Sequence, residues 1–204
     1  MSEIDRNIKR RAAIAYGEGS TLNDVDEITA IAFAFANRAR AWGGKTVDEL
    51  IAADPNYTYA IDGTNQRYES FMKRACVAEI DKDFGMAIAL EGASMARANE
   101  GVDPSRGAFW WDGLDFKTKY SNHPKVKDGF RFTNPKHNIF SVPEKSVEVA
   151  VFWKVRNVET GAEINSKLRG KYRCVWISTA AHGKTIFWIH DPEYLATSGG
   201  KKYR

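Results

Sequence analysis

The spacing of apolar residues changes near residue 100, and this change limits the folds that the chain can adopt. In the first hundred positions apolar residues recur at helical spacing. From Gly101 onward the sequence is rich in glycine, proline, asparagine and aromatic residues, a composition typical of loops and short strands. Helices followed by strands predict an α+β fold. We expect strands over 146–155, 171–179 and 184–190, the last two joined by a hairpin turn at AAHG.

A length of 204 residues is enough for one compact domain with a substantial core. Because no internal repeat or low-complexity linker interrupts the chain, we expect a single domain over 1–204. Its helical core with cleft loops would cover 1–145, and a strand-rich extension over 146–204 would pack on it. Helices are expected over 4–16, 47–53 and 76–99, the second of these capped by Thr46. Another helix is expected to begin after a cap at Asn23 or Asp24 and to end near Trp42. A hairpin or ordered loop is expected over 56–68.

Several classes of protein are not supported by the sequence. The chain has no apolar run of 18 residues, and its N-terminus lacks the pattern of a signal peptide, so we expect a soluble chain without an export signal of its own. The four histidines and two cysteines show no metal-binding spacing. The motifs GxSxG, GxGxxG and the P-loop are also missing. We therefore expect neither a metal ion nor another cofactor.

A single glutamate stands between the first two predicted helices, in the run AYGEGS. Glu18 has Gly17 before it and Gly19 after it, and a turn rich in capping residues follows. At the C-terminal end of a helix the dipole disfavours a negative charge, and the preceding residues 14–16 are largely apolar. Both effects favour the protonated carboxyl group that a general acid needs near neutral pH.

A second glutamate lies nine residues later, in the first turn of the second predicted helix. There the helix dipole favours the ionised form of Glu27. Two carboxyl groups with opposite preferences suit an acid and a base, or an acid and a charge stabiliser, in glycoside hydrolysis. The alternative for Glu27 is a structural charge that only complements the dipole. The sequence predicts Glu18 as the catalytic acid and Glu27 as the second carboxylate.

The surrounding motifs resemble a known family of cell-wall hydrolases, typified by spore-cortex-lytic enzymes. AYGEGS, a helix ending in ANRARA, the stretch GKTVDELI, then GVDPSRGAFWWDG and KHNIF are similar to its pattern, in order, over about residues 10–142. The resemblance implies a helix-rich, lysozyme-like fold around a glycan cleft, acting on peptidoglycan as a muramidase or lytic transglycosylase. It places the catalytic glutamate at Glu18.

The chain departs from that family in two ways. The second acidic residue of the family is absent, with Asn23 and Asp24 in its neighbourhood, and the region after 145 has no counterpart. The offset of Glu27 is similar to that of the second carboxylate of phage-type muramidases. This similarity implies hydrolysis by a lysozyme rather than transglycosylation by a single acid.

Aromatic and polar residues near the predicted cleft are candidates for binding the glycan. Aromatic rings present flat faces to sugars, and short polar side chains hydrogen-bond N-acetyl and hydroxyl groups. Each of these residues also has a purely structural alternative, because one of two adjacent tryptophans on a strand should point inward. The candidates are Tyr57, Tyr59, Trp110 and Trp111 among the aromatics, and Asp62, Thr64, Asn65 and Gln66 among the polar residues.

The uneven charge of the chain leaves other functions open. Residues 1–100 carry 12 Lys/Arg and 16 Asp/Glu, whereas 101–204 carry 18 and 10. A basic half suits a polyanion, so a non-catalytic module that binds cell wall or nucleic acid is the main alternative, although we consider nucleic acid the less favoured partner. A wall peptidase or amidase would need zinc or a reactive thiol.

The expected partners follow from the predicted activity. They are glycan strands of peptidoglycan and an immunity or inhibitor protein; no membrane is expected. Such an enzyme acts in the periplasm or cell wall of a bacterium. Without an export signal it would be delivered by a parent protein, a secretion system or lysis, as an antibacterial effector toxin or a phage lysis enzyme.

Overall fold

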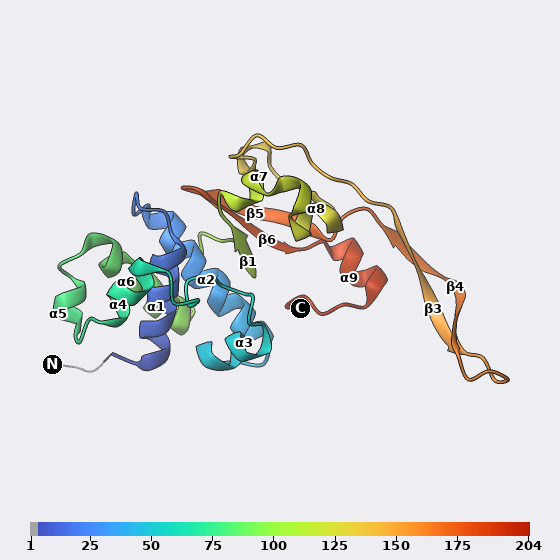
Figure 1. The fold of residues 1–204 in the computed structure, drawn as a ribbon, viewed down its shortest axis with the longest axis horizontal. Coiled ribbons are helices and arrows are strands. Elements are labelled where there is room, and N and C mark those ends of the chain that lie inside the picture. The colour runs from blue at the N-terminus through green and yellow to red at the C-terminus, as the bar shows by residue number, and fades with distance from the viewer. Residues whose placement is uncertain (1–3) are drawn as a thin grey trace.

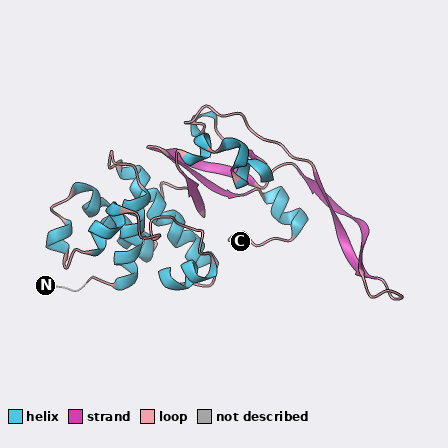
Figure 2. Ribbon diagram, in the orientation of Figure 1, coloured by secondary structure: helices cyan, strands magenta, loops and turns pink. Residues whose placement is uncertain are grey.

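The computed structural model describes residues 4–204 and has an α+β fold, as predicted. Helices from the first half of the chain form one side of the molecule, and a small sheet covered by short helices forms the other (Figures 1 and 2). Among the described residues, no helix is both long enough and apolar enough to cross a membrane. The helices of the first half are α1 (Arg6–Glu18), α2 (Val25–Ala41), α3 (Val47–Ala53), α4 (Gln66–Met72), α5 (Val77–Ile80) and α6 (Phe84–Ala98).

The core of the helical part is formed where α1, α2 and α6 pack together. Helix α2 is nearly surrounded, because apolar residues at helical spacing bury one face and small alanines let its neighbours approach the others. Asp24 caps α2 by accepting a hydrogen bond from the amide of Glu27 at 2.8 Å. Helix α1 runs two residues further than predicted, so that Glu18 is its last residue.

The expected long helix over 76–99 is instead two helices, α5 and α6. Asp83 separates them, because its carboxylate accepts a hydrogen bond from the amide of Met86 and so caps α6. Gly85 lies in the first turn of α6, where a Cβ atom would lie 2.4 Å from Asn23 Oδ1. The glycine therefore permits close packing and does not mark a break in the helix.

The central sheet has four strands, in the order β1-β6-β5-β2. β1 (Trp110–Asp112), β6 (Thr185–His190) and β5 (Trp176–His182) are antiparallel neighbours, whereas β2 (Phe130–Arg131) pairs with β5 in parallel. Two of its strands precede residue 145 and two follow it. The chain therefore does not divide into a core and an extension at this position.

A second apolar core lies on the sheet and consists mainly of aromatic side chains. Phe116, Phe130 and Trp188 are almost completely buried, and the rings of Phe116 and Phe130 meet edge to face with centroids 5.0 Å apart. Short helices close this side of the molecule. They are α7 (Asp115–Thr118), η1 (Tyr120–Asn122), α8 (Pro124–Asp128), η2 (Pro135–His137) and α9 (Pro192–Ser198).

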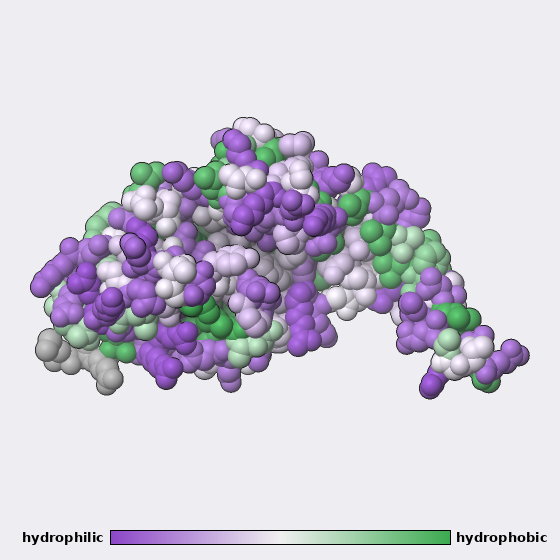
Figure 3. Space-filling view, viewed as in Figure 1, coloured by the Kyte–Doolittle hydropathy of each residue, from purple (hydrophilic) through white to green (hydrophobic). Residues whose placement is uncertain are grey.

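A two-stranded hairpin, β3 (Val149–Arg156) and β4 (Glu163–Tyr172), projects from the body of the molecule (Figure 1). The strand β3 was expected, but β4 was not. Most of β4 is exposed, so its sequence lacks the alternation that a strand with one buried face shows. Apolar side chains remain exposed along this arm (Figure 3), including Trp153, Val155, Ile164 and Leu168.

Candidate active site

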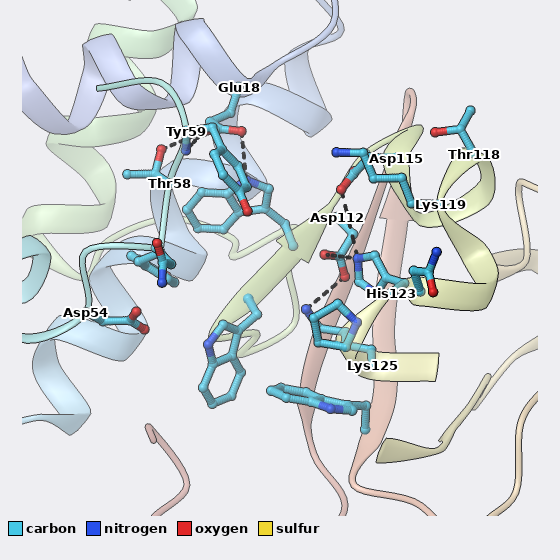
Figure 4. A pocket seen from close by; sticks show the side chains of 18 residues that line it. Glu18, Asp54, Thr58, Tyr59, Asp112, Asp115, Thr118, Lys119, His123 and Lys125 are labelled. Atoms are coloured by element: carbon cyan, nitrogen blue, oxygen red, sulfur yellow. Dashed lines mark hydrogen bonds and ion pairs between the residues drawn. The ribbon is translucent and has the colours of Figure 1, made fainter. Parts of the chain in front are cut away.

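A cavity of about 800 Å³ lies between the helical part and the sheet. Glu18 and the loop 54–59 form one wall, and residues of β1 and the 112–125 segment form the opposite wall (Figure 4). Trp176 of β5 completes the lining. Of the predicted site residues, the cavity brings together Glu18, Tyr57, Tyr59, Trp110 and Trp111.

The carboxylate of Glu18 is held through one of its two oxygens. The hydroxyl of Thr58 and the amides of Tyr59 and Ala60 all donate to Oε1, the amides at 2.9 Å. Among residues 4–204, Oε2 accepts only from the indole N–H of Trp111, at 3.4 Å. Three donors fix the position of Oε1, which makes Oε2 the oxygen available for proton exchange with a ligand.

The two glycines beside Glu18 are explained by close packing on both sides of the turn. A Cβ atom on Gly17 would lie 3.1 Å from Asn65 Oδ1, and one on Gly19 would lie 2.8 Å from Ile28 Cγ1. Asn65 also donates from Nδ2 to the carbonyl of Gly17 at 3.0 Å. The end of α1 is thus clamped between the start of α4 and α2, which fixes the backbone that carries Glu18.

The wall opposite Glu18 carries a buried charged cluster that was not predicted. Asp112 Oδ1 lies 3.3 Å from His123 Nε2, and Asp112 Oδ2 lies 2.9 Å from Lys125 Nζ. A second carboxylate, that of Asp115, lies 3.9 Å from His123 Nε2. Strand alternation alone could have found Asp112, because it places this residue on the same face of β1 as Trp110.

The aromatic residues of the cavity have different roles. Tyr57 donates its hydroxyl to the carbonyl of Phe109 at 2.7 Å, and burial raises its pKa far above the usual value, so it serves as a scaffold. Trp110 meets Trp176 edge to face, with ring centroids 4.9 Å apart. Tyr59 is 70% exposed at the rim and offers a free face to a ligand.

Arg38 supports this aromatic wall from within. Its guanidinium lies 4.3 Å from the ring centroid of Tyr57 and 4.8 Å from that of Trp110. It also pairs with Asp54 at 2.7 Å and donates from Nε to the carbonyl of Tyr203. The C-terminal segment is therefore packed against the site region.

The four predicted polar binding residues lie outside the cavity lining. Asp62 accepts hydrogen bonds from the amide and hydroxyl of Thr64, at 2.8 and 2.6 Å, within one exposed turn. Asn65 caps α4 through the amide of Tyr68. Gln66 is exposed at the first position of α4. Their contacts shape the loop behind Glu18 and do not face the cavity.

Glu27 does not share the cavity with Glu18, contrary to the expected pairing. Its side chain is 1% exposed and accepts hydrogen bonds from four donors. The amide and hydroxyl of Ser20 donate to Oε2, and the amide of Lys184 and the hydroxyl of Thr185 donate to Oε1. The first turn of α2 faces the β5–β6 turn, so Glu27 joins these two elements and has no route to a ligand beside Glu18.

A buried histidine lies next to the aromatic wall, and its titration predicts how stability depends on pH. Burial lowers the pKa of His190 to about 4, and the positive charges of Lys125 and Arg38 act in the same direction. The ring of His190 packs 4.5 Å from Trp110 and 4.4 Å from Trp176, between centroids. This residue must therefore stay neutral for the wall to pack.

We expect the contribution of His190 to the free energy of unfolding to be constant above about pH 6.5 and to fall as the pH drops toward 4. The unfolded chain takes up the proton first, because its histidine pKa is the higher of the two. Thermal unfolding at pH 7.5 and 5.0 measures the loss. His190→Phe keeps a ring in place and should shrink the difference; an equal loss in this variant would contradict the assignment.

Within residues 4–204, no three His, Cys, Asp or Glu side chains are grouped so that they could hold a metal ion. Cys76 and Cys174 are free thiols, and burial raises the pKa of Cys174 to about 11. No protein-family model, curated protein or solved structure matches the chain. The assignment of function therefore depends on the geometry of the cavity.

Proposed function

We propose that the protein is a peptidoglycan glycosidase, a lysozyme that cleaves the β-1,4 bond between N-acetylmuramic acid and N-acetylglucosamine. The observation that carries the proposal is the asymmetric support of Glu18. Oε1 is fixed by three donors, while Oε2, beside the indole of Trp111, remains free to protonate a glycosidic oxygen. We infer a lysozyme-like arrangement from this helix-end glutamate beside a cleft of about 800 Å³.

Further support comes from the lining of the cavity. Trp110, Trp111 and Tyr59 offer aromatic faces to sugar rings. The cavity is large enough to hold several glycan atoms on each side of the glycosidic bond that is cleaved. Cleavage by hydrolysis requires a second group that activates water or balances the developing positive charge. Asp112 and Asp115 supply carboxylates on the wall opposite Glu18. We assign the role of the second group to these carboxylates.

Lytic transglycosylation is the second candidate, and the position of Glu27 favours it. That reaction uses one acid and closes the product on itself, so it needs no second carboxylate beside Glu18. The products separate the two chemistries, because hydrolysis leaves reducing ends and transglycosylation leaves anhydro ends.

The test is digestion of purified, insoluble peptidoglycan followed by mass spectrometry of the released fragments. We expect soluble disaccharide-peptides with reducing ends. Anhydro ends would indicate a lytic transglycosylase in place of a muramidase. Cut peptides would indicate a peptidase or amidase. Retention on the wall without release would support a binding module instead and contradict the proposed enzyme.

The setting of the reaction is part of the same proposal. A peptidoglycan glycosidase acts in the bacterial cell wall, delivered there as an interbacterial effector or a phage lysis enzyme. A cell that makes such a toxin would need an immunity protein that blocks the cleft. This setting is tested by directing the parent protein and the Glu18→Gln variant to the periplasm of a bacterial host. Lysis of the host is expected with the parent protein and not with the variant.

A further inference from the structure

A buried arginine in the helical part forms no ion pair with any of the described residues. Arg11 of α1 is 4% exposed. Its Nε and Nη1 atoms have no hydrogen-bond partner among the described residues. A buried ionised group whose N–H donors lack hydrogen-bond partners is destabilising, so this position favours binding of an anionic ligand.

More positive charges surround Arg11. A cavity of about 40 Å³ is lined by Arg11 together with Arg40, Lys45 and Arg97. None of these four residues belongs to an ion pair within residues 4–204. Burial and the charges of Arg97 and Arg40 lower the pKa of Arg11 to about 10, and the charge of Asp5 opposes this shift only in part.

The ends of nearby helices explain only part of the cluster. Basic side chains are favoured at helix C-termini, and both α2 and α6 end beside this cavity. Arg40 follows this rule, since it donates to the carbonyl of Ala96 at 2.6 Å and to Asn37 Oδ1. Arg11 lies in the middle of α1, with its guanidinium 5.8 Å from the centroid of the Phe35 ring, and bonds to neither helix end.

We propose that this cavity binds a small doubly charged oxyanion, a phosphate group, between Arg11, Arg40, Lys45 and Arg97. The volume exceeds that of a single water site. Guanidinium groups present paired N–H donors that match phosphate oxygens. A dianion balances several cations better than a single carboxylate does.

The ion has two sources, free phosphate or a phosphate carried by a larger molecule. Arg40 and Arg97 are exposed, so the cavity can be reached from the surface. The site shares no lining residue with the cavity of Glu18, and its occupancy does not depend on the proposed glycosidase activity. The expected consequence of binding is a more stable packing of α1 against α2.

The experiment titrates sodium phosphate into the full chain at constant ionic strength, with chloride as the reference, and follows Tm and binding heat. We expect a saturable rise of about 5 to 10 °C at a phosphate concentration about 100 times the dissociation constant. A parallel titration with glycerol 3-phosphate separates the sources, because it competes only if the cavity admits a substituted phosphate.

Arg11→Met should remove the response to phosphate and, in chloride alone, have a Tm equal to or above that of the parent protein. Methionine fills much of the same volume without the uncompensated charge. Arg6→Met, on the same helix but with a side chain that is 80% exposed, is the matched control and should keep the response. A phosphate effect no larger than that of chloride, or an equal response in Arg11→Met, would overturn the proposal.

Discussion

Glu18→Gln should reduce the release of soluble fragments from peptidoglycan by about 100- to 10,000-fold, the usual contribution of a general acid. The amide oxygen can still accept from Thr58, Tyr59 and Ala60, so the loop and the cavity keep their shape. What the variant lacks is the exchangeable proton at the position of Oε2. The rate is measured with purified wall and compared with the thermal unfolding of both proteins.

Glu91→Gln on α6 is the matched control, because that glutamate is exposed and does not line the cavity. It should keep the parent activity. If Glu18→Gln is folded and retains activity within a few-fold of the parent, the acid is another residue. Thr58→Val adds an independent measure, since losing one of the three donors to Oε1 should lower the rate by less than the loss of the acid itself.

The second large effect is expected on stability. Glu27→Ala should lower the free energy of unfolding by about 3 kcal/mol or more, because it leaves the buried hydroxyl of Thr185 and the partly buried donors of Ser20 and Lys184 without an acceptor. For a chain of this size such a loss corresponds to a fall in Tm of roughly 6 to 12 °C. Denaturant and thermal unfolding both measure it.

Asp26→Ala is the control for this prediction. Asp26 precedes Glu27 in the first turn of α2, but its side chain is 68% exposed, so its loss should change stability little. A catalytic Glu27 would behave differently. Its removal would lower kcat, measured at a temperature well below Tm, while the protein stayed as stable as the parent. That pattern would contradict the structural role.

Local signals in the sequence were sufficient for much of the helical half. Asp24 and Thr46 act as the predicted caps, α3 has its predicted bounds, and Glu18 ends α1 beside a cavity. These features depend on residues that are neighbours in the chain. The prediction over 76–99 was wrong because a side-chain cap at Asp83 competes with continuous helical periodicity.

The rest of the site depends on contacts between distant parts of the chain. Glu27 had the expected place in the first turn of α2, yet its partners Lys184 and Thr185 are more than 150 positions away. The pairing of Asp112 with His123 and Lys125 likewise requires the return of the chain from β1 to α8. Helix position alone could not distinguish a glutamate facing a ligand from one joining two elements.

The projecting hairpin has a consequence for how this architecture can vary. β2 and β5 are parallel neighbours, and Phe130 of β2 bridges to Lys145. The two ends of the excursion that contains β3 and β4 also meet, because the amide of Val147 donates to the carbonyl of Arg173 at 2.8 Å. The cost of closing a longer excursion grows only slowly with its length. Chains built on the same plan can thus lengthen, shorten or exchange β3 and β4 while the cavity beside Glu18 stays intact.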